Sequence, residues 1–205
     1  RVIPTNRRLR SQFSIPVGEE NGASHDDLVK VQVTGARIYG LPEAQVTEII
    51  GDASSPRAPS LIAIQSNDIP TDFSLDAIRA AEAAKPLSLS RRTDLRKTPL
   101  VTIDGADARD FDDAVWAEPD LDPKNIGGWH LLVAIADVSW YVRAGEPLDR
   151  DAYTRGNSVY FPDRVVPMLP EALSNGLCSL VPNEDRGCLA AHMWIDAFGN
   201  LRRHE

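Results

Sequence analysis

The chain has 205 residues, of which 42% are hydrophobic and 25% are charged, and none of its apolar runs approaches the roughly 18 residues of a membrane span. We therefore expect a soluble globular protein with one large domain or two small ones, and the composition excludes a membrane-spanning class. The net charge of −8 argues at first against a nucleic acid partner, because Lys and Arg normally drive phosphate binding.

The charges are distributed unevenly along the chain. Basic residues cluster at Arg7, Arg8 and Arg10 and again in residues 85–97, whereas acidic residues concentrate in 104–122. A basic track beside an acidic pocket would suit a polyanionic substrate handled by metal ions. Charges scattered over a solvated surface would produce the same pattern, and charge alone favours neither interpretation.

The start of the chain bears on its completeness, and the two cysteines bear on its cellular compartment. The opening RVIPTNRRLR holds neither an initiator Met nor a signal peptide, so we expect a piece of a longer protein. Cys178 and Cys188 lack zinc-ligand spacing, which favours buried, reduced thiols over a metal site or a disulfide. Reduced thiols are typical of the cytoplasm, which is the predicted location.

Residues 1–52 are predicted to form a small β-barrel domain. Strand-like runs cover 12–17, 27–38 and 44–52, and Gly and Asp residues bound each run. Several short strands within about 50 residues are typical of the OB-type barrel, which binds single-stranded nucleic acids. Aromatic residues are sparse here, so this domain is a weak functional signal by itself.

Residues 53–97 are predicted to be a connector. A loop covers 53–60, and a short apolar run follows and ends at a proline. The alanine-rich segment 74–85 predicts a helix with Ser74 as its N-cap and Pro86 as its stop.

Residues 98–205 predict a second domain with an α+β sheet. We expect strands over 99–104, 112–120 and 129–142, a short helix over 148–156, and a final hairpin that turns at Gly199. The hairpin ends without a covering element, so we expect a continuation of the chain to cover the edges of the sheet.

The segment TIDGADARDFDDAV (102–115) concentrates negative charge between apolar flanks. If Asp104, Asp110, Asp112 and Asp113 converge, they repel one another and raise each other's pKa values unless cations neutralise them. Carboxylate oxygens are hard ligands that select Mg²⁺ or Mn²⁺. Two such ions about 4 Å apart can activate water and stabilise the leaving oxygen in phosphodiester hydrolysis.

This segment has two other interpretations. A calcium-binding EF-hand is excluded, because a loop starting at Asp104 would place Ala106 and Ala108 at ligand positions. Acidic residues on a solvated loop stay possible from the residue types alone, although the apolar flanks favour a half-buried position.

Four successive motifs then identify a family. TIDGADARDFDDAV, HLLVAIADVSWYV, LDRDAYTRGNSVYFP and VVPMLPEALSNGLCSLVPNEDR closely resemble the catalytic (RNB) domain of the ribonuclease II and ribonuclease R family of 3′ to 5′ exoribonucleases, and ribonuclease R more nearly. The resemblance covers residues 98–205, and residues 1–52 are similar to the cold-shock (OB) domain that precedes this domain in the family.

The resemblance implies roles for five residues. Asp104, Asp110 and Asp113 correspond to residues that help bind Mg²⁺, and Asp112 to the residue most critical for cleavage, through a second metal or the attacking water. Tyr160 corresponds to an aromatic residue that contacts the RNA 3′ end. Without the resemblance, we would interpret Tyr160 as a packed structural residue whose hydroxyl is hydrogen-bonded within the protein.

Four further residues are not assigned to catalysis. Asp137 is interpreted as a buried strand residue that caps a neighbouring backbone, and His130 and His192 as lone histidines packed beside strands. Arg109 could meet a phosphate or pair with an aspartate, and the sequence favours neither.

The resemblance implies a Mg²⁺-dependent exoribonuclease that releases nucleoside 5′-monophosphates from single-stranded RNA, with Mn²⁺ as a substitute ion. The family's catalytic domain continues beyond the matched motifs, and a further RNA-binding domain normally follows. We therefore expect the rest of the enzyme to complete the site, most simply as a second chain of a nicked enzyme. The alternative is an RNA-binding module without catalytic activity of its own.

Overall fold

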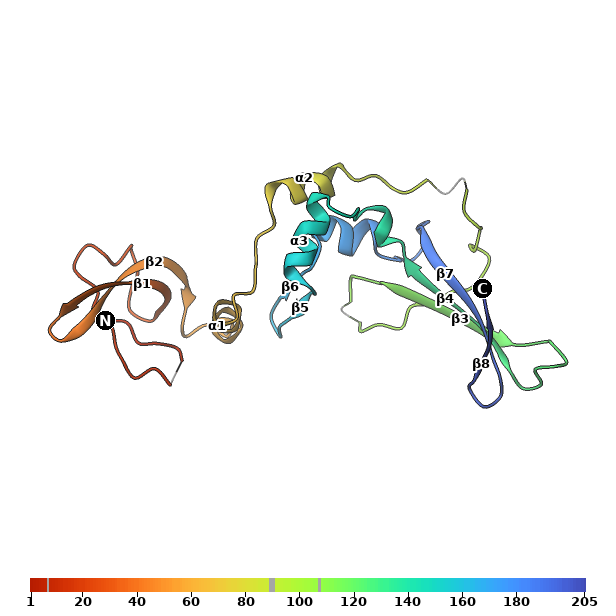
Figure 1. Ribbon diagram of the computed structural model, residues 1–205, viewed down its shortest axis with the longest axis horizontal. Helices are drawn as coiled ribbons and strands as arrows, with labels where there is room; N and C mark the ends of the chain where they lie inside the picture. Colours follow the sequence, from red (N-terminus) through yellow and green to blue (C-terminus); the bar gives the residue numbers. More distant parts are fainter. Residues whose placement is uncertain (7, 89–90, 107) are drawn as a thin grey trace. The chain divides into compact units, whose positions relative to one another are not determined.

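The computed structural model describes residues 1–205 except residues 7, 89, 90 and 107. The chain divides into two compact units (Figure 1). Unit 1 comprises residues 1–71 and 160–165, and unit 2 comprises residues 72–159 and 166–205.

Unit 1 is built on two long antiparallel strands, β1 (Asp27–Ile38) and β2 (Leu41–Asp52). Tyr39 and Gly40 join them, both with positive φ (51° and 79°), as a two-residue hairpin turn requires. Ala44 and Val46 of β2 are buried and belong to the core of this unit. Both long strands were predicted, although β2 begins three residues before the predicted start at residue 44.

The predicted strand over 12–17 was wrong. Only two isolated bridges form in this region, Val2 with Phe13 and Ser14 with Glu43. Pro16 lacks the N–H that a ladder needs, and Gly18 turns the chain with a φ of 92°. The segment therefore contacts β2 at one point instead of extending the sheet.

Helix α1 (Ala58–Ser66) crosses the boundary between the predicted loop and the apolar run. Pro59 lies in its first turn, where proline is tolerated because the missing N–H has no partner in the helix. Ala58, Ser60 and Ile64 are buried on the inner side of this helix.

Unit 2 contains a four-stranded antiparallel sheet in the order β3-β4-β7-β8 (Figure 1). The strands are β3 (Asp113–Pro119), β4 (Trp129–Ala136), β7 (Cys188–Ile195) and β8 (Leu201–His204). Ala114, Leu132 and Ala134 share one buried face of this sheet. The predicted strand over 112–120 and the final hairpin are thus confirmed.

Two other predicted strands need correction. The segment 99–104 makes only a bridge, in which the N–H groups of Val101 and Val115 each donate to the other's carbonyl. The strand predicted over 129–142 ends at Ala136, because the chain turns into a 3₁₀ helix at Val138–Trp140. Directly after β4, the N–H of Asp137 still donates to the carbonyl of Gly187, the residue before β7, at 3.0 Å.

A helical layer forms the second part of unit 2. It contains α2 (Leu75–Ala83), α3 (Pro147–Arg155) and a π-helical turn (Leu173–Leu177). Their shared core consists of Ala77, Ala81, Leu148, Leu173 and Cys178. Both predicted helices are confirmed.

The ends of α2 follow the predicted capping pattern. The Ser74 hydroxyl accepts a hydrogen bond from the Ala77 N–H at 3.2 Å, and the helix ends at Ala83, three residues before Pro86. Across the described part of the chain, no helix has the length and apolar character needed to span a membrane.

Two short strands, β5 (Val159–Tyr160) and β6 (Val165–Val166), pair in a small hairpin. Residues 160–165, which include its turn, belong to unit 1. There the Ser60 hydroxyl of α1 donates a hydrogen bond to the carboxylate of Asp163.

Candidate active site

The aspartate segment lies at one end of the four-stranded sheet. Asp112 directly precedes β3, and its carbonyl accepts a hydrogen bond from the N–H of Ala136 at the end of β4, at 2.9 Å. Asp113 opens β3 opposite Ile135. The sheet therefore fixes the backbone of these two aspartates.

The residues just before Asp112 are held by a different part of unit 2. The Phe111 N–H donates to the Ser179 hydroxyl at 2.9 Å, and that hydroxyl donates to the Arg109 carbonyl at 3.0 Å. The Leu180 N–H donates to the Phe111 carbonyl at 2.8 Å. The loop that carries Asp110 is thus attached to residues 179–180 by three hydrogen bonds.

The four predicted aspartates interact electrostatically. Loss of water around its carboxylate raises the pKa of Asp112, and the negative charges of Asp110, Asp113 and Asp104 raise it further. Asp110 is half-buried, and the other three residues are exposed. The structure therefore brings the four carboxylates close enough for each of the others to disfavour the ionised form of Asp112.

The donor set fits a hard divalent cation. Carboxylate oxygens are the preferred ligands of Mg²⁺ and Mn²⁺, and a cation would relieve the repulsion that raises the pKa of Asp112. Within the described ranges, however, no three His, Cys, Asp or Glu side chains form a group that could hold a metal. Metal binding by this set stays a prediction.

A fifth aspartate of the same segment was missed by the sequence reasoning. Asp107 lies between Asp104 and Asp110 and was not included in the predicted set. It falls outside the residues that the structure describes.

Acidic neighbours engage part of the basic segment 85–97. Arg92 pairs with Asp137, whereas Arg96 pairs with Asp94 at 2.7 Å and with Asp185 at 3.3 Å. These arginines serve ion pairs within the protein, which favours the structural interpretation for this part of the segment.

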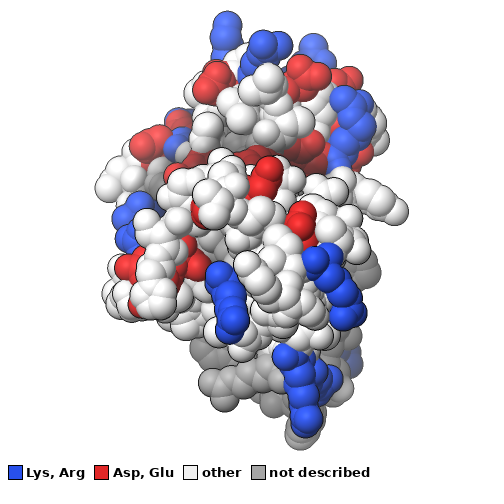
Figure 2. Space-filling view, turned by 90° about the vertical axis from the view of Figure 1, so that its left-hand side faces the viewer, with Lys and Arg blue, Asp and Glu red and all other residues white. Residues whose placement is uncertain are grey.

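The N-terminal basic cluster is described only in part, because Arg7 lies outside the described residues, while Arg8 and Arg10 are exposed. Figure 2 shows Lys and Arg side chains at several places on one face, in the upper part next to Asp and Glu side chains and in the lower part separated by other residues.

Asp137 is a structural residue, as predicted, but its contacts differ from the expected backbone cap. The residue is 5% exposed, and its carboxylate accepts hydrogen bonds from Arg92 and from the Ser139 hydroxyl, the latter at 2.7 Å. Burial raises the pKa of Asp137, but the hydrogen bonds from Ser139 and Arg92 outweigh it, and the pKa lies below its ordinary value.

Tyr160 is 64% exposed and lies on β5, in the part of the hairpin that belongs to unit 1. The four aspartates belong to unit 2. Its exposure fits a residue that contacts a ligand, and its role in RNA binding stays a prediction.

The two histidines are not isolated, contrary to the prediction. Nε2 of His130 lies 2.9 Å from Nδ1 of His192, and the Trp194 ring stacks on His130 with centroids 4.5 Å apart. The pairing of β4 with β7 places His130 opposite Trp194. The contacts account for both histidines as packing groups on the sheet, as the preferred interpretation had it.

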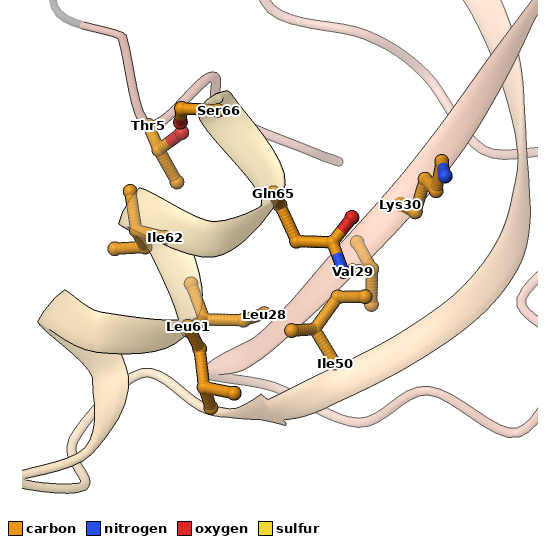
Figure 3. A pocket seen from close by; sticks show the side chains of 9 residues that line it. All are labelled: Thr5, Leu28, Val29, Lys30, Ile50, Leu61, Ile62, Gln65 and Ser66. Atoms are coloured by element: carbon orange, nitrogen blue, oxygen red, sulfur yellow. The ribbon is translucent and has the colours of Figure 1, made fainter. Parts of the chain in front are cut away.

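Neither the cysteines nor a cavity in unit 1 adds a reactive group to the predicted site. Cys178 and Cys188 are free, and burial raises the pKa of the Cys178 thiol to about 11, which makes it a poor nucleophile. A cavity of about 240 Å³ lies in unit 1, where Leu61 and Gln65 of α1 face β1 and β2 (Figure 3). None of the predicted site residues lines it.

The family comparisons agree with this layout. A model described as the RNB domain matches residues 92–205, more than half of the chain, and a cold shock domain model matches residues 2–74. The chain belongs to the RNB-domain family. The resemblance to ribonucleases II and R is confirmed, and so is the α+β fold in which a cold-shock unit precedes part of an RNB domain.

Individual relatives show how much of the RNB-domain protein is represented. Ribonuclease R of Vibrio parahaemolyticus is 44% identical over 210 residues, which cover 100% of the chain and 25% of that protein. Ribonuclease R of Escherichia coli is 43% identical over 98% of the chain and 25% of its own length. The chain therefore spans about a quarter of these relatives.

A solved structure matches both units. The structure of Mycoplasma genitalium RNase R in complex with double-stranded RNA superposes with a TM-score of 0.83 at 25% sequence identity, over 97% of this chain and 35% of that one.

Proposed function

We propose that this RNB-domain chain carries the metal-binding carboxylates of a 3′ to 5′ exoribonuclease that hydrolyses single-stranded RNA to nucleoside 5′-monophosphates. The proposal is supported by the acidic motif within the RNB match and by the raised pKa of Asp112, to which the charges of Asp110, Asp113 and Asp104 contribute after loss of water. The similarity to ribonuclease R proteins supports the reaction and the substrate class.

The four carboxylates have separate tasks in this proposal. Asp104, Asp110 and Asp113 would hold Mg²⁺, or Mn²⁺ in its place, and Asp112 would orient the attacking water or hold a second ion. When bound, the ions supply a water of lowered pKa and neutralise charge on the scissile phosphate. The sheet and residues 179–180 hold the backbone next to Asp110 and at Asp112, which supports a site whose backbone is in place before substrate binds.

Tyr160 would contact the RNA near its 3′ end. Its exposed ring can stack on any base, and such a contact contributes about 1–3 kcal/mol without sequence preference. This suits an enzyme that shortens RNA irrespective of sequence.

The proposal includes a partner and a location. The remainder of the enzyme, either as a second chain or as a further segment, would complete the RNB domain and add a further RNA-binding domain. The chain spans only about a quarter of its curated relatives, which supports this view. Two free cysteines suit the reducing cytoplasm.

A labelled RNA tests the proposal. The full-length protein and the chain alone should each be mixed with a 5′-labelled single-stranded RNA and Mg²⁺, with EDTA and with an RNA whose 3′ hydroxyl is blocked as controls. We expect stepwise shortening from the 3′ end by the full-length protein and release of nucleoside 5′-monophosphates. Endonucleolytic fragments, or hydrolysis that is unaffected by EDTA, would contradict the proposal.

The second candidate is an RNA-binding module without catalysis. It is favoured for the isolated chain by the lack of a preformed metal group among the described residues. If the chain binds RNA with and without Mg²⁺ but the full-length protein never shortens it, this candidate replaces the first.

A further inference from the structure

We propose that Ser179 is a positioning residue for the aspartate segment: its buried hydroxyl sets the backbone that carries Asp110 and Asp112 for metal binding. The inference rests on the proposed function, because it assigns these aspartates to a cation. It adds a residue that is distant in sequence and has no charge of its own.

The hydroxyl of Ser179 bridges two backbone groups of the segment. It donates to the Arg109 carbonyl at 3.0 Å and accepts from the Phe111 N–H at 2.9 Å. These two groups flank Asp110, and Phe111 directly precedes Asp112. One hydroxyl therefore restrains the backbone on both sides of a predicted ligand.

Burial makes this bridge hard to replace. Ser179 is 0% exposed, so water cannot easily take over the two hydrogen bonds if the hydroxyl is removed. The Leu180 N–H adds a third bond, to the Phe111 carbonyl at 2.8 Å. Without the hydroxyl, the loop would lose two of its three hydrogen bonds to residues 179–180 and keep the bond from Leu180.

Ser179 is in turn fixed from behind. Nε of Arg186 donates to the Ser179 carbonyl at 3.1 Å, and Arg186 pairs with Glu184 at 2.7 Å. The preceding residue, Cys178, belongs to the core of unit 2 together with Leu173. Through these contacts Ser179 connects the packed core to the aspartate segment.

Removal of the hydroxyl should therefore loosen the loop and weaken metal binding. In Ser179→Ala, we expect the amide hydrogen of Phe111 to exchange at least about tenfold faster in the metal-free protein. We also expect the dissociation constant for Mn²⁺, measured by calorimetry without RNA, to rise about 10-fold to 100-fold, as for other residues that orient metal ligands. Ser179→Cys should give intermediate values, because a thiol is a weak donor and acceptor.

Ser174→Ala is the matched control. Ser174 is half-buried in the neighbouring π-helical turn, and its hydroxyl contacts Asn175 instead of the aspartate segment. We expect this variant to keep the wild-type exchange rate at Phe111 and the wild-type affinity for Mn²⁺. If both variants lose affinity equally, the effect is general and the inference is wrong.

The remaining outcomes separate this inference from the proposed function. Wild-type exchange and affinity in Ser179→Ala would overturn the inference alone. If Ser179→Ala does not fold, as judged by circular dichroism, Ser179→Cys decides on the same two readouts. Mn²⁺ binding that weakens as expected in a protein that never hydrolyses RNA would contradict the proposed function and uphold the inference, whereas a wild-type protein that binds no Mn²⁺ would overturn both.

Discussion

Asp112 and Asp137 are aspartates that flank neighbouring strands at the same end of one sheet, yet their surroundings are opposite. Asp112 precedes β3 among three other carboxylates, and Asp137 follows β4 beside Arg92 and Ser139. The pKa of Asp112 is raised by loss of water and by like charges. The pKa of Asp137 is lowered, although burial opposes the shift, because hydrogen bonds from Ser139 and Arg92 favour its ionised form.

The difference shows how a structural carboxylate can be told from a candidate ligand. Asp137 has its cation and its hydroxyl donor within the protein, so it requires nothing from outside. Asp112 is surrounded by charges of its own sign, and an added cation would stabilise the ionised form of the whole group. The position on the sheet is similar, and the neighbours decide the role.

The largest expected effect is that of Asp112→Asn on catalysis. We expect RNA hydrolysis with Mg²⁺ to fall at least about 100-fold, because even residues that only orient metal ligands cost 10-fold to 100-fold when they are changed. The same substitution removes a repelled charge, so the metal-free protein should melt at an equal or higher temperature. A 3′-shortening assay and a melting curve measure the two effects.

Asp122→Asn is a suitable control for this substitution, because Asp122 lies in the β3–β4 loop and its carboxylate accepts a hydrogen bond from the nearby Lys124 N–H. It should keep wild-type activity. Full activity of Asp112→Asn would show that Asp112 is not needed for catalysis, and its contrast with Asp137 would then carry no functional meaning.

Asp137→Asn should act on stability. The substitution leaves the Arg92 guanidinium without its carboxylate at a largely buried position, and we expect a loss of about 2 kcal/mol in the free energy of unfolding. Urea denaturation measures the loss. An unchanged midpoint would show that the ion pair with Arg92 contributes little, and Asp137 would then differ less from Asp112 than we infer.

The two aspartates should also respond to acid in opposite ways. Since the pKa of Asp112 is raised, its carboxylate protonates at a higher pH than an ordinary aspartate, and Mn²⁺ affinity should then fall about tenfold per pH unit below that pKa. In the metal-free protein, this protonation relieves repulsion, so the destabilising effect of Asp112 disappears as the pH falls. The stabilising effect of Asp137 persists to lower pH and is lost only as the pH falls through its lowered pKa.

Calorimetry with Mn²⁺ at several pH values tests this contrast, with Asp112→Asn as the reference. If the pH dependence of Mn²⁺ affinity survives unchanged in that variant, another group is responsible for it.

The smallest expected effect is that of Ser139→Ala. It removes one of the hydrogen bonds to the Asp137 carboxylate while Arg92 stays in place, so we expect a loss of about 1 kcal/mol at neutral pH. The loss should shrink in acid, because the bond matters most when the carboxylate is ionised. Urea midpoints at neutral pH and below the ordinary aspartate pKa provide the measurement, and an equal loss at both would argue against this cause.

Patterns that are local in sequence predicted much of the fold. Alternating apolar residues located β1, Gly199 located the turn of the final hairpin, and Ser74 and Pro86 located the ends of α2. The segment 99–104 looked like a strand, but only Val101 found a partner, because pairing depends on a neighbour that the segment itself does not specify.

The same limit applies to the site: its local motif could be predicted, whereas its contacts with distant segments could not. Its acidic motif is contiguous, so Asp104, Asp110, Asp112 and Asp113 could be named from the sequence. Ser179 could not, since its bond to Arg109 joins residues 70 positions apart and a buried serine has no distinctive pattern. The contact between His130 and His192 likewise depends on the register of β4 with β7.

The strand order β3-β4-β7-β8 also has a consequence for how the protein folds. β3 with β4 and β7 with β8 are local hairpins, whereas β4 meets β7 only after the chain has closed a loop through residues 137–187. Closing long loops slows folding, so we expect the hairpins to form early and to dock late. Asp112 and Asp113 would become ordered when β3 pairs with β4. Ser179 would reach them only when the 137–187 connection closes, so the aspartate segment would gain its final shape in the last step of folding.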